Sequence, residues 1–302
     1  MTTIPLKTTG PASTSAPPRR RRGRRASRLG LGQRLGAVLV WLVVAFNVAL
    51  LVWLVASSLK TTRAIFDNPW SLPTDLELGN YARAWSDSKF GAAAINTVAV
   101  VVVAGLLIVG FAAPAAYALA RGAARVGQAV TALLAVGMGI PFQVIMIPLF
   151  VMIQRLNLVN SLTGLVLIYV ATSLPFTVIL LTGFFRTLPS EMEEAAALDG
   201  AGVIRTFVTI MLPLVRSGLI TAFLLNVIGL WNETFIALIF LQSAEKQTLS
   251  LALLGFMQRQ QYNGADWGGL FAGVCILILP TLLLYVWLGR RIVEGLTLGA
   301  GK

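Results

Sequence analysis

The stretch Glu191–Leu219, EMEEAAALDGAGVIRTFVTIMLPLVRSGL, is polar at its start within a chain that is otherwise mostly apolar. We call this segment the acidic elbow. Beyond Gly200 its apolar residues recur with the spacing of a helix, and Pro213 then interrupts that helix. The sequence therefore predicts two short helices joined at Gly200. The first nine positions hold four acidic residues: Glu191, Glu193, Glu194 and Asp199.

The ends and faces of these two helices are predicted from local chemistry. Ser190 is a candidate N-cap, and Glu193 three positions later completes a capping box. Gly200 supplies the left-handed or tight turn that ends the first helix, and Ala195–Ala197 give that helix a smooth face. A rigid elbow of this kind is more often a docking surface than an accidental loop. The apolar face of the second helix is predicted to comprise Val203, Phe207, Ile210, Met211 and Leu214.

The composition outside the elbow is that of a membrane protein. Of the 302 residues, 57% are hydrophobic and 12% are charged, whereas soluble proteins contain about 25% charged residues. Six apolar runs are long enough to cross a bilayer as helices. The predicted fold class is therefore an all-α membrane protein with six transmembrane helices. The six runs are Leu35–Leu59, Ala92–Ala120, Val126–Ile153, Leu162–Phe185, Ser217–Leu241 and Trp267–Gly289.

The N-terminal segment, residues 1–34, is strongly basic. It holds nine of the 24 Lys and Arg residues, and Pro11, Pro17 and Pro18 favour disorder. A disordered tail that stays in the cytoplasm is favoured over an arm that binds nucleic acid or anionic lipid. With the tail inside, 17 basic residues fall on the cytoplasmic side and seven on the other side. Both termini and the acidic elbow are therefore predicted to be cytoplasmic.

Several classes of active site are excluded by what the chain lacks. It has no histidine, which removes histidine-based triads, metal sites and proton relays. Its single cysteine, Cys275, cannot form an intrachain disulfide. The C-terminal Gly299–Lys302 imitates the end of a phosphate-binding loop, but Leu296 occupies the position of the first glycine. We therefore expect no enzyme activity, no metal and no cofactor in this chain.

Several motifs, in order along the chain, resemble one known family. Within the elbow, Glu194-Ala195-Ala196 and Asp199-Gly200-Ala201, followed by Ile210, Leu212 and Pro213, resemble the EAA loop of ABC importer permeases. More narrowly, Trp231-Asn232-Glu233 resembles a segment of the fifth span in carbohydrate-uptake permeases of the maltose type. The resemblance runs from about residue 50 to the C-terminus. Two further stretches are similar to that family: Ser58-Leu59-Lys60 through Asn68-Pro69-Trp70, and Asp266-Trp267-Gly268 through Glu294-Gly295-Leu296-Thr297.

This resemblance implies a MetI-like bundle with a cytoplasmic coupling helix. Residues 35–91 would form the first transmembrane helix and an external segment. Residues 92–302 would form the core permease domain, with a coupling loop at 186–216. The family often has a proline where this chain has Ser217. This difference bears on the rigidity of the chain where the helix ends, and not on the resemblance. The residues implied to contact an ATP-hydrolysing subunit are Glu194, Ala195, Ala196, Asp199 and Gly200.

The partners implied by the resemblance define an importer in the inner membrane of a bacterium or an archaeon. They are a second permease subunit, a cytoplasmic ATPase dimer that binds ATP and magnesium, an external sugar-binding protein, and the membrane lipid. The cargo would be a monosaccharide, an oligosaccharide or a polyol, moved by alternating access. The resemblance implies no nucleic-acid partner.

Glu233 is the one acidic residue deep within an apolar run, and an ionisable group there is a candidate functional residue. Two roles are open: a hydrogen bond to a sugar hydroxyl during passage, or a bond across helices to Asn232, Asn96 or Gln143. The second role is favoured. Core packing is the alternative for the neighbouring candidates. The candidates for a substrate path are Asn226, Trp231, Asn232 and Glu233.

The alternative function is a proton-coupled secondary carrier that uses Glu233 as its proton site. One acid without a histidine or a paired base makes a poor proton relay. Such a carrier would also leave the acidic elbow without a role. The sequence therefore favours the ATP-driven importer.

Overall fold

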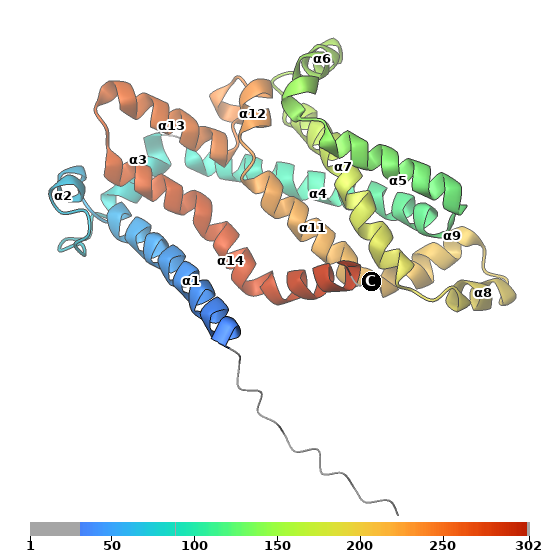
Figure 1. The fold of residues 1–302 in the computed structure, drawn as a ribbon. Helices are drawn as coiled ribbons and strands as arrows, with labels where there is room; N and C mark the ends of the chain where they lie inside the picture. Colours follow the sequence, from blue (N-terminus) through green and yellow to red (C-terminus); the bar gives the residue numbers. More distant parts are fainter. Residues whose placement is uncertain (1–30, 88, 301–302) are drawn as a thin grey trace, which may run out of the picture. The chain divides into compact units, whose positions relative to one another are not determined.

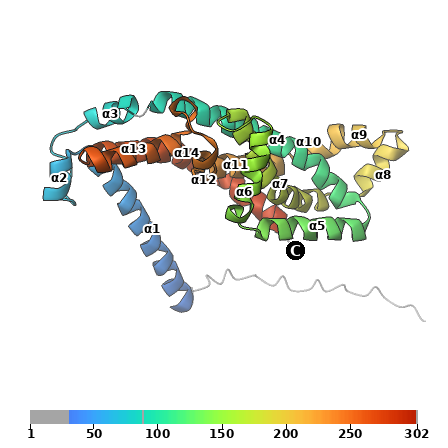
Figure 2. The ribbon, with the colours of Figure 1, turned by 90° about the horizontal axis from the view of Figure 1, so that it is seen from above.

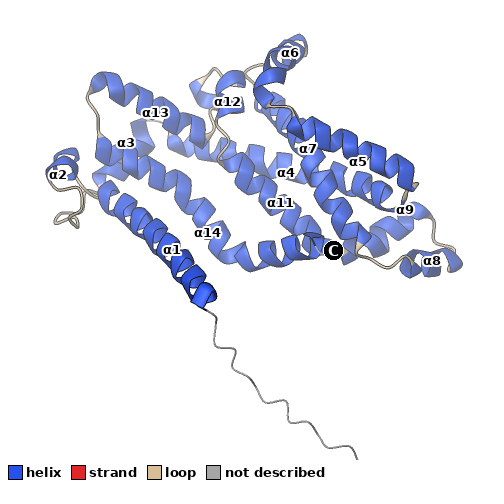
Figure 3. Ribbon diagram, viewed as in Figure 1, coloured by secondary structure: helices blue, strands red, loops and turns tan. Residues whose placement is uncertain are grey.

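The computed structural model describes residues 31–87 and 89–300. These residues form helices joined by loops, and none of them lies in a strand (Figures 1 and 3). The chain divides into two compact units, residues 1–49 and residues 50–302, each described by itself. In the first unit the described residues form the start of helix α1 (Leu31–Ser58). The predicted basic tail, residues 1–34, lies outside the described residues apart from its last four, which begin α1.

Four of the described helices are long and apolar enough to cross a membrane, which agrees with the predicted all-α membrane fold. Two bent pairs of helices meet the same criterion when each pair is taken together, so the number of spans is four, or six if each pair counts as one. The four helices are α1, α4 (Phe90–Arg121), α7 (Leu162–Arg186) and α14 (Trp267–Ala300). The pairs are α5 (Ala124–Gly139) with α6 (Phe142–Arg155), bent by 95°, and Val203–Leu214 with α11 (Arg216–Trp231), bent by 74°.

Two of the predicted runs are broken rather than continuous. The run Val126–Ile153 divides at Ile140, whose backbone is extended (φ −81°, ψ 117°). This break has a local cause, because Ile140 precedes Pro141 and a proline disfavours the helical conformation at the residue before it. The run Ser217–Leu241 divides after Trp231, and a separate short helix, α12 (Phe235–Phe240), follows.

The core of the second unit lies between α4 and α7. Helix α4 packs along α7, and α11 packs against α4, α7 and α14. Ile108 of α4 and Tyr169 of α7 are fully buried in this core. Helices α11 and α7 approach closely at Gly218, where a Cβ atom would lie 2.6 Å from the ring of Phe184. The lack of a side chain at this position therefore sets the separation of the two helices.

Short helices surround the end of the second unit that is remote from the elbow. Figures 1 and 2 place α3 (Gly79–Asp87) and the elbow helix α8 (Glu191–Leu198) at opposite ends of α4. The sequence reasoning did not predict α13 (Leu249–Asn263), although its buried residues follow helical spacing. The remaining elements at this end are α2 (Thr62–Asp67), α12 and the 3₁₀ turn η2 (Ala244–Lys246). The buried residues of α13 include Leu249, Ala252, Leu253 and Phe256.

Candidate coupling elbow and substrate path

The acidic elbow folds as two helices joined at Gly200, as predicted. Helix α8 ends at Leu198, and Gly200 has φ 77°, in the left-handed region. Two hydrogen bonds close the end of α8: the amide of Gly200 donates to the carbonyl of Ala197 (3.0 Å), and that of Ala201 donates to the carbonyl of Ala196 (2.9 Å). This pair of bonds defines a Schellman motif, which favours glycine at the left-handed position. The turn is thereby fixed by the backbone alone.

The predicted capping box at the start of α8 is wrong. Ser190 has a helical backbone (φ −67°, ψ −25°), and its side chain makes no capping hydrogen bond. A capping side chain requires an extended backbone at that residue to reach the amides that follow. Glu193 instead accepts a hydrogen bond at 3.0 Å from Nε of Arg121, the last residue of α4. The Arg121 Nη2 atom also donates to the carbonyl of Leu188 at 2.9 Å, so one guanidinium holds both the chain before α8 and α8 itself.

Most of the residues predicted to contact an ATPase are exposed. Glu194, Ala195, Asp199 and Gly200 lie on the surface, whereas the side chain of Ala196 is buried within the chain. The predicted contact of Ala196 with a partner therefore does not extend to its side chain in this conformation. Apolar side chains adjoin the exposed acidic residues, and Leu198 exposes 90% of its surface. The tip of the elbow consequently presents both acidic and apolar groups.

The second half of the elbow is anchored later along the chain than predicted. Val203, in the short helix α9 (Val203–Thr206), is exposed and belongs to no buried face. Burial begins at Thr206, the last residue of α9; Phe207, which starts the π-helical turn η1 (Phe207–Met211), is half-buried, and Met211 is fully buried. Phe207 packs against aromatic rings of α4 and α7, with ring centroids 5.1 Å from Tyr117 and 6.2 Å from Phe185. Leu214, also predicted for this face, is exposed, and Val215 is buried in its place, because the π-helical turn shifts the spacing of the residues that follow it.

The candidate substrate-path residues lie on α11 and at its end. Asn226 is buried, and its Nδ2 atom donates to the Thr177 hydroxyl of α7 at 3.0 Å. Trp231 is buried too, and its Nε1 atom donates to the carbonyl of Leu277 in α14 at 3.0 Å. Asn232 is exposed, and its side chain donates back to its own helix. Two of these side chains therefore bond α11 to its neighbours.

Glu233 joins three elements at the break between α11 and α12. The Tyr169 hydroxyl of α7 donates to Glu233 Oε2 at 2.7 Å. The amides of Ile236 and Ala237, in the first turn of α12, donate to Oε1 (2.7 Å) and Oε2 (3.2 Å). A carboxylate at a helix N-terminus is favoured because the first amides of a helix have no partner within it. A bond across helices was predicted for Glu233, and its partner is Tyr169 rather than Asn232, Asn96 or Gln143.

An apolar cleft of about 510 Å³ lies between α4, α5 and α7. Its lining includes Phe111, Leu134 and Pro175 and none of the four candidate path residues. The side chains that line this cleft offer a sugar no hydrogen-bonding groups. It therefore does not mark the predicted path.

The match to a known family covers both the elbow and the α11–α12 break. The family of binding-protein-dependent transport system inner membrane components matches residues 108–294. This chain belongs to that family. It is thus a multi-pass membrane protein and a permease of the ABC importer class, as predicted, and the proton-coupled carrier is not supported.

Two relatives resemble the permease over most of their length. The diacetylchitobiose uptake system permease protein NgcG of Streptomyces coelicolor is 35% identical over 270 residues, covering 88% of this chain and 89% of that protein. The melibiose/raffinose/stachyose import permease protein MelC of Bacillus subtilis is 34% identical over 250 residues, covering 82% and 89%.

A solved structure shows the same fold. It is the crystal structure of a bacterial ABC transporter involved in the import of the acidic polysaccharide alginate, and it matches with a TM-score of 0.73. The match covers 85% of this chain and 94% of that chain at 24% identity. This similarity confirms the MetI-like architecture of the permease.

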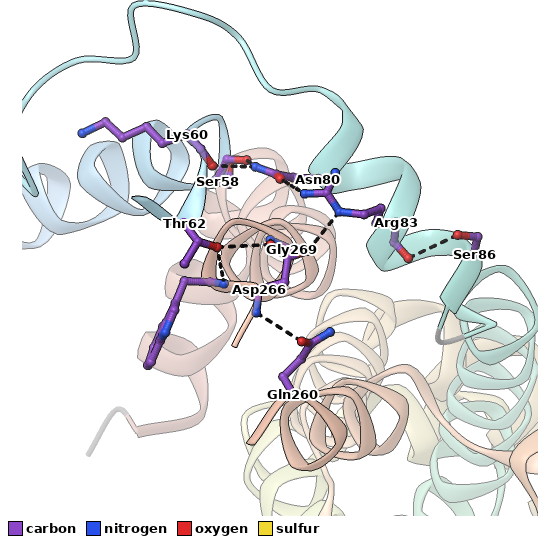
Figure 4. Close-up of polar contacts among 10 residues, drawn as sticks. Ser58, Lys60, Thr62, Asn80, Arg83, Ser86, Gln260, Asp266 and Gly269 are labelled. Carbon is purple, nitrogen blue, oxygen red and sulfur yellow. Dashed lines mark hydrogen bonds and ion pairs between the residues drawn. The ribbon is translucent and has the colours of Figure 1, made fainter. Parts of the chain in front are cut away.

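A polar network at the opposite end of the permease joins two distant stretches that resemble the family (Figure 4). Asp266, just before α14, accepts from Nε of Arg83 in α3 at 3.0 Å, and Arg83 also bonds Asn80. The Nδ2 atom of Asn80 donates to the carbonyls of Ser58 and Lys60, each at 2.8 Å. Burial raises the pKa of Asp266, but the bonds from Arg83 and from the Gly269 amide outweigh it and lower the pKa below its usual value. The network ties the end of α1 to the start of α14.

Three residues in these contacts were not singled out by the sequence reasoning. Arg121 lies at the end of an apolar run in the sequence, but nothing near it along the chain indicates its partners. Tyr169 carries a hydroxyl within an apolar helix, and such a group requires a partner when it is buried. Asn160 has a left-handed backbone (φ 54°), and its Oδ1 atom accepts from the amides of Gln242 and Ser243. Nothing in the local sequence identified that last role.

Proposed function

We propose that this permease carries a sugar across the cytoplasmic membrane by alternating access, as one subunit of an ATP-driven importer. The sugar would be a monosaccharide, an oligosaccharide or a polyol. The substrates named for the relatives, diacetylchitobiose for one and melibiose, raffinose and stachyose for the other, support a carbohydrate. The observation that carries the coupling role is the exposed surface from Glu194 to Gly200, held rigidly on the end of α4 by Arg121.

The partners follow from this role. A cytoplasmic ATPase dimer, which binds ATP and magnesium, docks on the acidic elbow. A second permease subunit completes the translocation path, and an external binding protein delivers the sugar to the opposite face. Both termini and the elbow then lie in the cytoplasm, in agreement with the excess of basic residues on that side.

The contacts of the elbow explain how movement of the ATPase would reach the spans. The elbow continues into α11 through η1, and the ring of Phe207 packs against α4 and α7. The ion pair between Arg121 and Glu193 adds a second link to α4. Because interiors pack densely and transmit displacement, closing of the ATPase dimer would move α11 and α4 together.

The α11–α12 break is the proposed place of substrate contact within this subunit. Asn232 is the exposed side chain among the four candidates. Asn226, Trp231 and Glu233 hold α11 against its neighbours, so they shape the path rather than offer free hydrogen-bonding groups. A sugar would therefore meet Asn232 first on this side of the path.

Uptake by elbow variants tests the proposal. Uptake of labelled diacetylchitobiose, melibiose and mannitol is measured in cells that express the whole importer, together with ATPase activity in their membranes. Glu194→Lys and Gly200→Asp are expected to abolish uptake of the transported sugar while the chain still inserts. Glu191→Lys is the matched control, because Glu191 is an exposed acid of the same helix outside the predicted contact. Normal uptake by both elbow variants would contradict the coupling role.

A further inference from the structure

The loop that follows α2 presents large apolar side chains outward. We call residues 68–73 (Asn68–Pro73) the Trp70 loop. Trp70 exposes 77% of its surface and Leu72 exposes 75%. A loop in water gains nothing from displaying such side chains, because burial of apolar surface away from water is favourable. The surroundings of the loop therefore require an explanation.

The Trp70 loop lies alongside the last two turns of α1, the first membrane-spanning helix. A shallow apolar cleft of about 420 Å³ separates Leu72 and Pro73 from Val52 and Val55 of α1. The rings of Trp53 and Trp70 lie 5.8 Å apart, and Trp53 Nε1 donates to the carbonyl of Pro69 at 2.8 Å. The loop thus sits beside helical residues that belong to an apolar span rather than above the end of that span.

Several polar groups of the Trp70 loop have partners within the chain. Lys60 is 3% exposed, and its ammonium donates to the Asn68 carbonyl (3.2 Å) and to the Ser71 hydroxyl (3.1 Å). Figure 4 shows this side chain extending away from Asn80, which binds the backbone carbonyl of Lys60 instead. Internal donors of this kind are dispensable for a hydrated loop. They are needed where water is scarce, because an unsatisfied carbonyl there is costly.

We propose that the Trp70 loop is immersed in the lipid interface on the membrane face opposite the acidic elbow, where it anchors the end of α1. The loop lies at the boundary between lipid headgroups and acyl chains. The exposed surfaces of Trp70 and Leu72 continue the exposed apolar flank of α1, formed by Val52 and Val55, which faces lipid in a spanning helix. Tryptophan is enriched at this depth because its ring is apolar and its indole N–H is polar. The inference rests on membrane insertion and not on the proposed sugar transport.

The depth of a spin label tests the proposal directly. A nitroxide is attached to Leu72→Cys in the full-length chain, after Cys275→Ala has removed the buried native cysteine. Asp75→Cys, an exposed position three residues further on, is the matched control. The labelled chain is reconstituted in vesicles of phosphatidylethanolamine and phosphatidylglycerol. Collision with apolar oxygen should dominate at position 72, and collision with a water-soluble nickel chelate should dominate at position 75.

A second experiment tests whether Lys60 holds the Trp70 loop in the lipid interface. In the Leu72→Cys background, Lys60→Met should raise nickel collision at position 72 to the level at position 75, and Lys60→Arg should leave position 72 in lipid. Trp53→Phe, which removes one donor and keeps a ring, replaces Lys60→Met if that variant does not fold. Nickel collision dominating at both positions of the otherwise native chain would overturn the proposal. So would protection of position 72 that arises only when an external protein is added.

Discussion

Arg121 is expected to hold the acidic elbow in place, and Arg121→Met tests this. The substitution removes the guanidinium while keeping an apolar chain of similar length. Two charge-assisted contacts are lost: the one to the Glu193 carboxylate at 3.0 Å and the one to the Leu188 carbonyl at 2.9 Å. The side chains of Arg121 and Glu193 are each 21% exposed, so water screens the pair only in part.

The size of the effect follows from these contacts. Hydrogen bonds to charged groups contribute about 1.5–3 kcal/mol each, and partial exposure lowers that figure, since exposed pairs contribute about 0–1 kcal/mol. We take about 2 kcal/mol for the loss of both contacts, which corresponds to roughly 30-fold in the equilibrium between the attached and the released elbow. A released α8 would unravel, because isolated helices of its length are unstable in water.

Amide hydrogen exchange measures this opening. Exchange of the amides in α8 should accelerate by roughly 30-fold in Arg121→Met, because protection reports the free energy of local opening. Arg186→Met, which changes an exposed arginine at the end of α7, is the matched control and should leave α8 unchanged. In the double variant that swaps the two charges, Arg121→Glu with Glu193→Arg, amide hydrogen exchange in α8 should return toward the native rate. Native protection of α8 in Arg121→Met would refute the role of the ion pair.

Three further predictions follow from single contacts. The ion pair with Arg83 lowers the pKa of Asp266 despite burial. The ion pair therefore stabilises the protein at neutral pH, and this stabilisation is lost as the pH falls through the lowered pKa. Asp266→Asn should cost about 1 kcal/mol of unfolding free energy at pH 7 and nothing in strong acid. Gly218→Ala should destabilise the protein by about 1–3 kcal/mol because its Cβ meets the Phe184 ring, as thermal unfolding in detergent would show. Glu233→Gln should cost about 1–2 kcal/mol of unfolding free energy but leave uptake dependent on ATP and not on a proton gradient.

Each of these three predictions has a control variant and a result that would contradict it. Asp75→Asn changes an exposed acid in the loop before α3, and a difference between native protein and Asp266→Asn that persisted in strong acid would contradict the pKa argument. Gly229→Ala places a Cβ on the same helix with nothing within 4 Å, and equal unfolding of Gly218→Ala and Gly229→Ala would contradict the packing argument. Loss of proton-linked uptake in Glu233→Gln would restore the secondary carrier.

The features that the sequence predicted well depend on residues close together along the chain. The turn at Gly200 needs only a residue that tolerates positive φ, and this can be recognised from the glycine after a short helical pattern. The break at Ile140 was not predicted, although its cause is local, because proline restricts its predecessor; the angle of 95° depends on packing. Helix α13 carries a helical apolar spacing but, at 15 residues, is too short to be recognised as a membrane span.

The features that the sequence could not supply join residues that are far apart. Arg121 and Glu193 are separated by 72 positions, and Tyr169 and Glu233 by 64. A buried charge requires a partner, so the existence of a bond at Glu233 followed from physical chemistry. The identity of that partner depends on how α7 packs against the break, which a single sequence does not reveal. The failed capping box at Ser190 has the same origin, because a distant arginine competes for Glu193.

Cross-linking from the tip of the elbow tests the coupling role most directly. Asp199→Cys, in a Cys275→Ala chain within the assembled importer, would carry a short photoactivated cross-linker. The expected product joins this chain to the ATP-hydrolysing subunit, and the same reagent at Asp75→Cys, near the opposite end of α4, should give no such product. If the subunits copurify and Asp199→Cys still yields no cross-link to the ATPase, the elbow is not its docking surface.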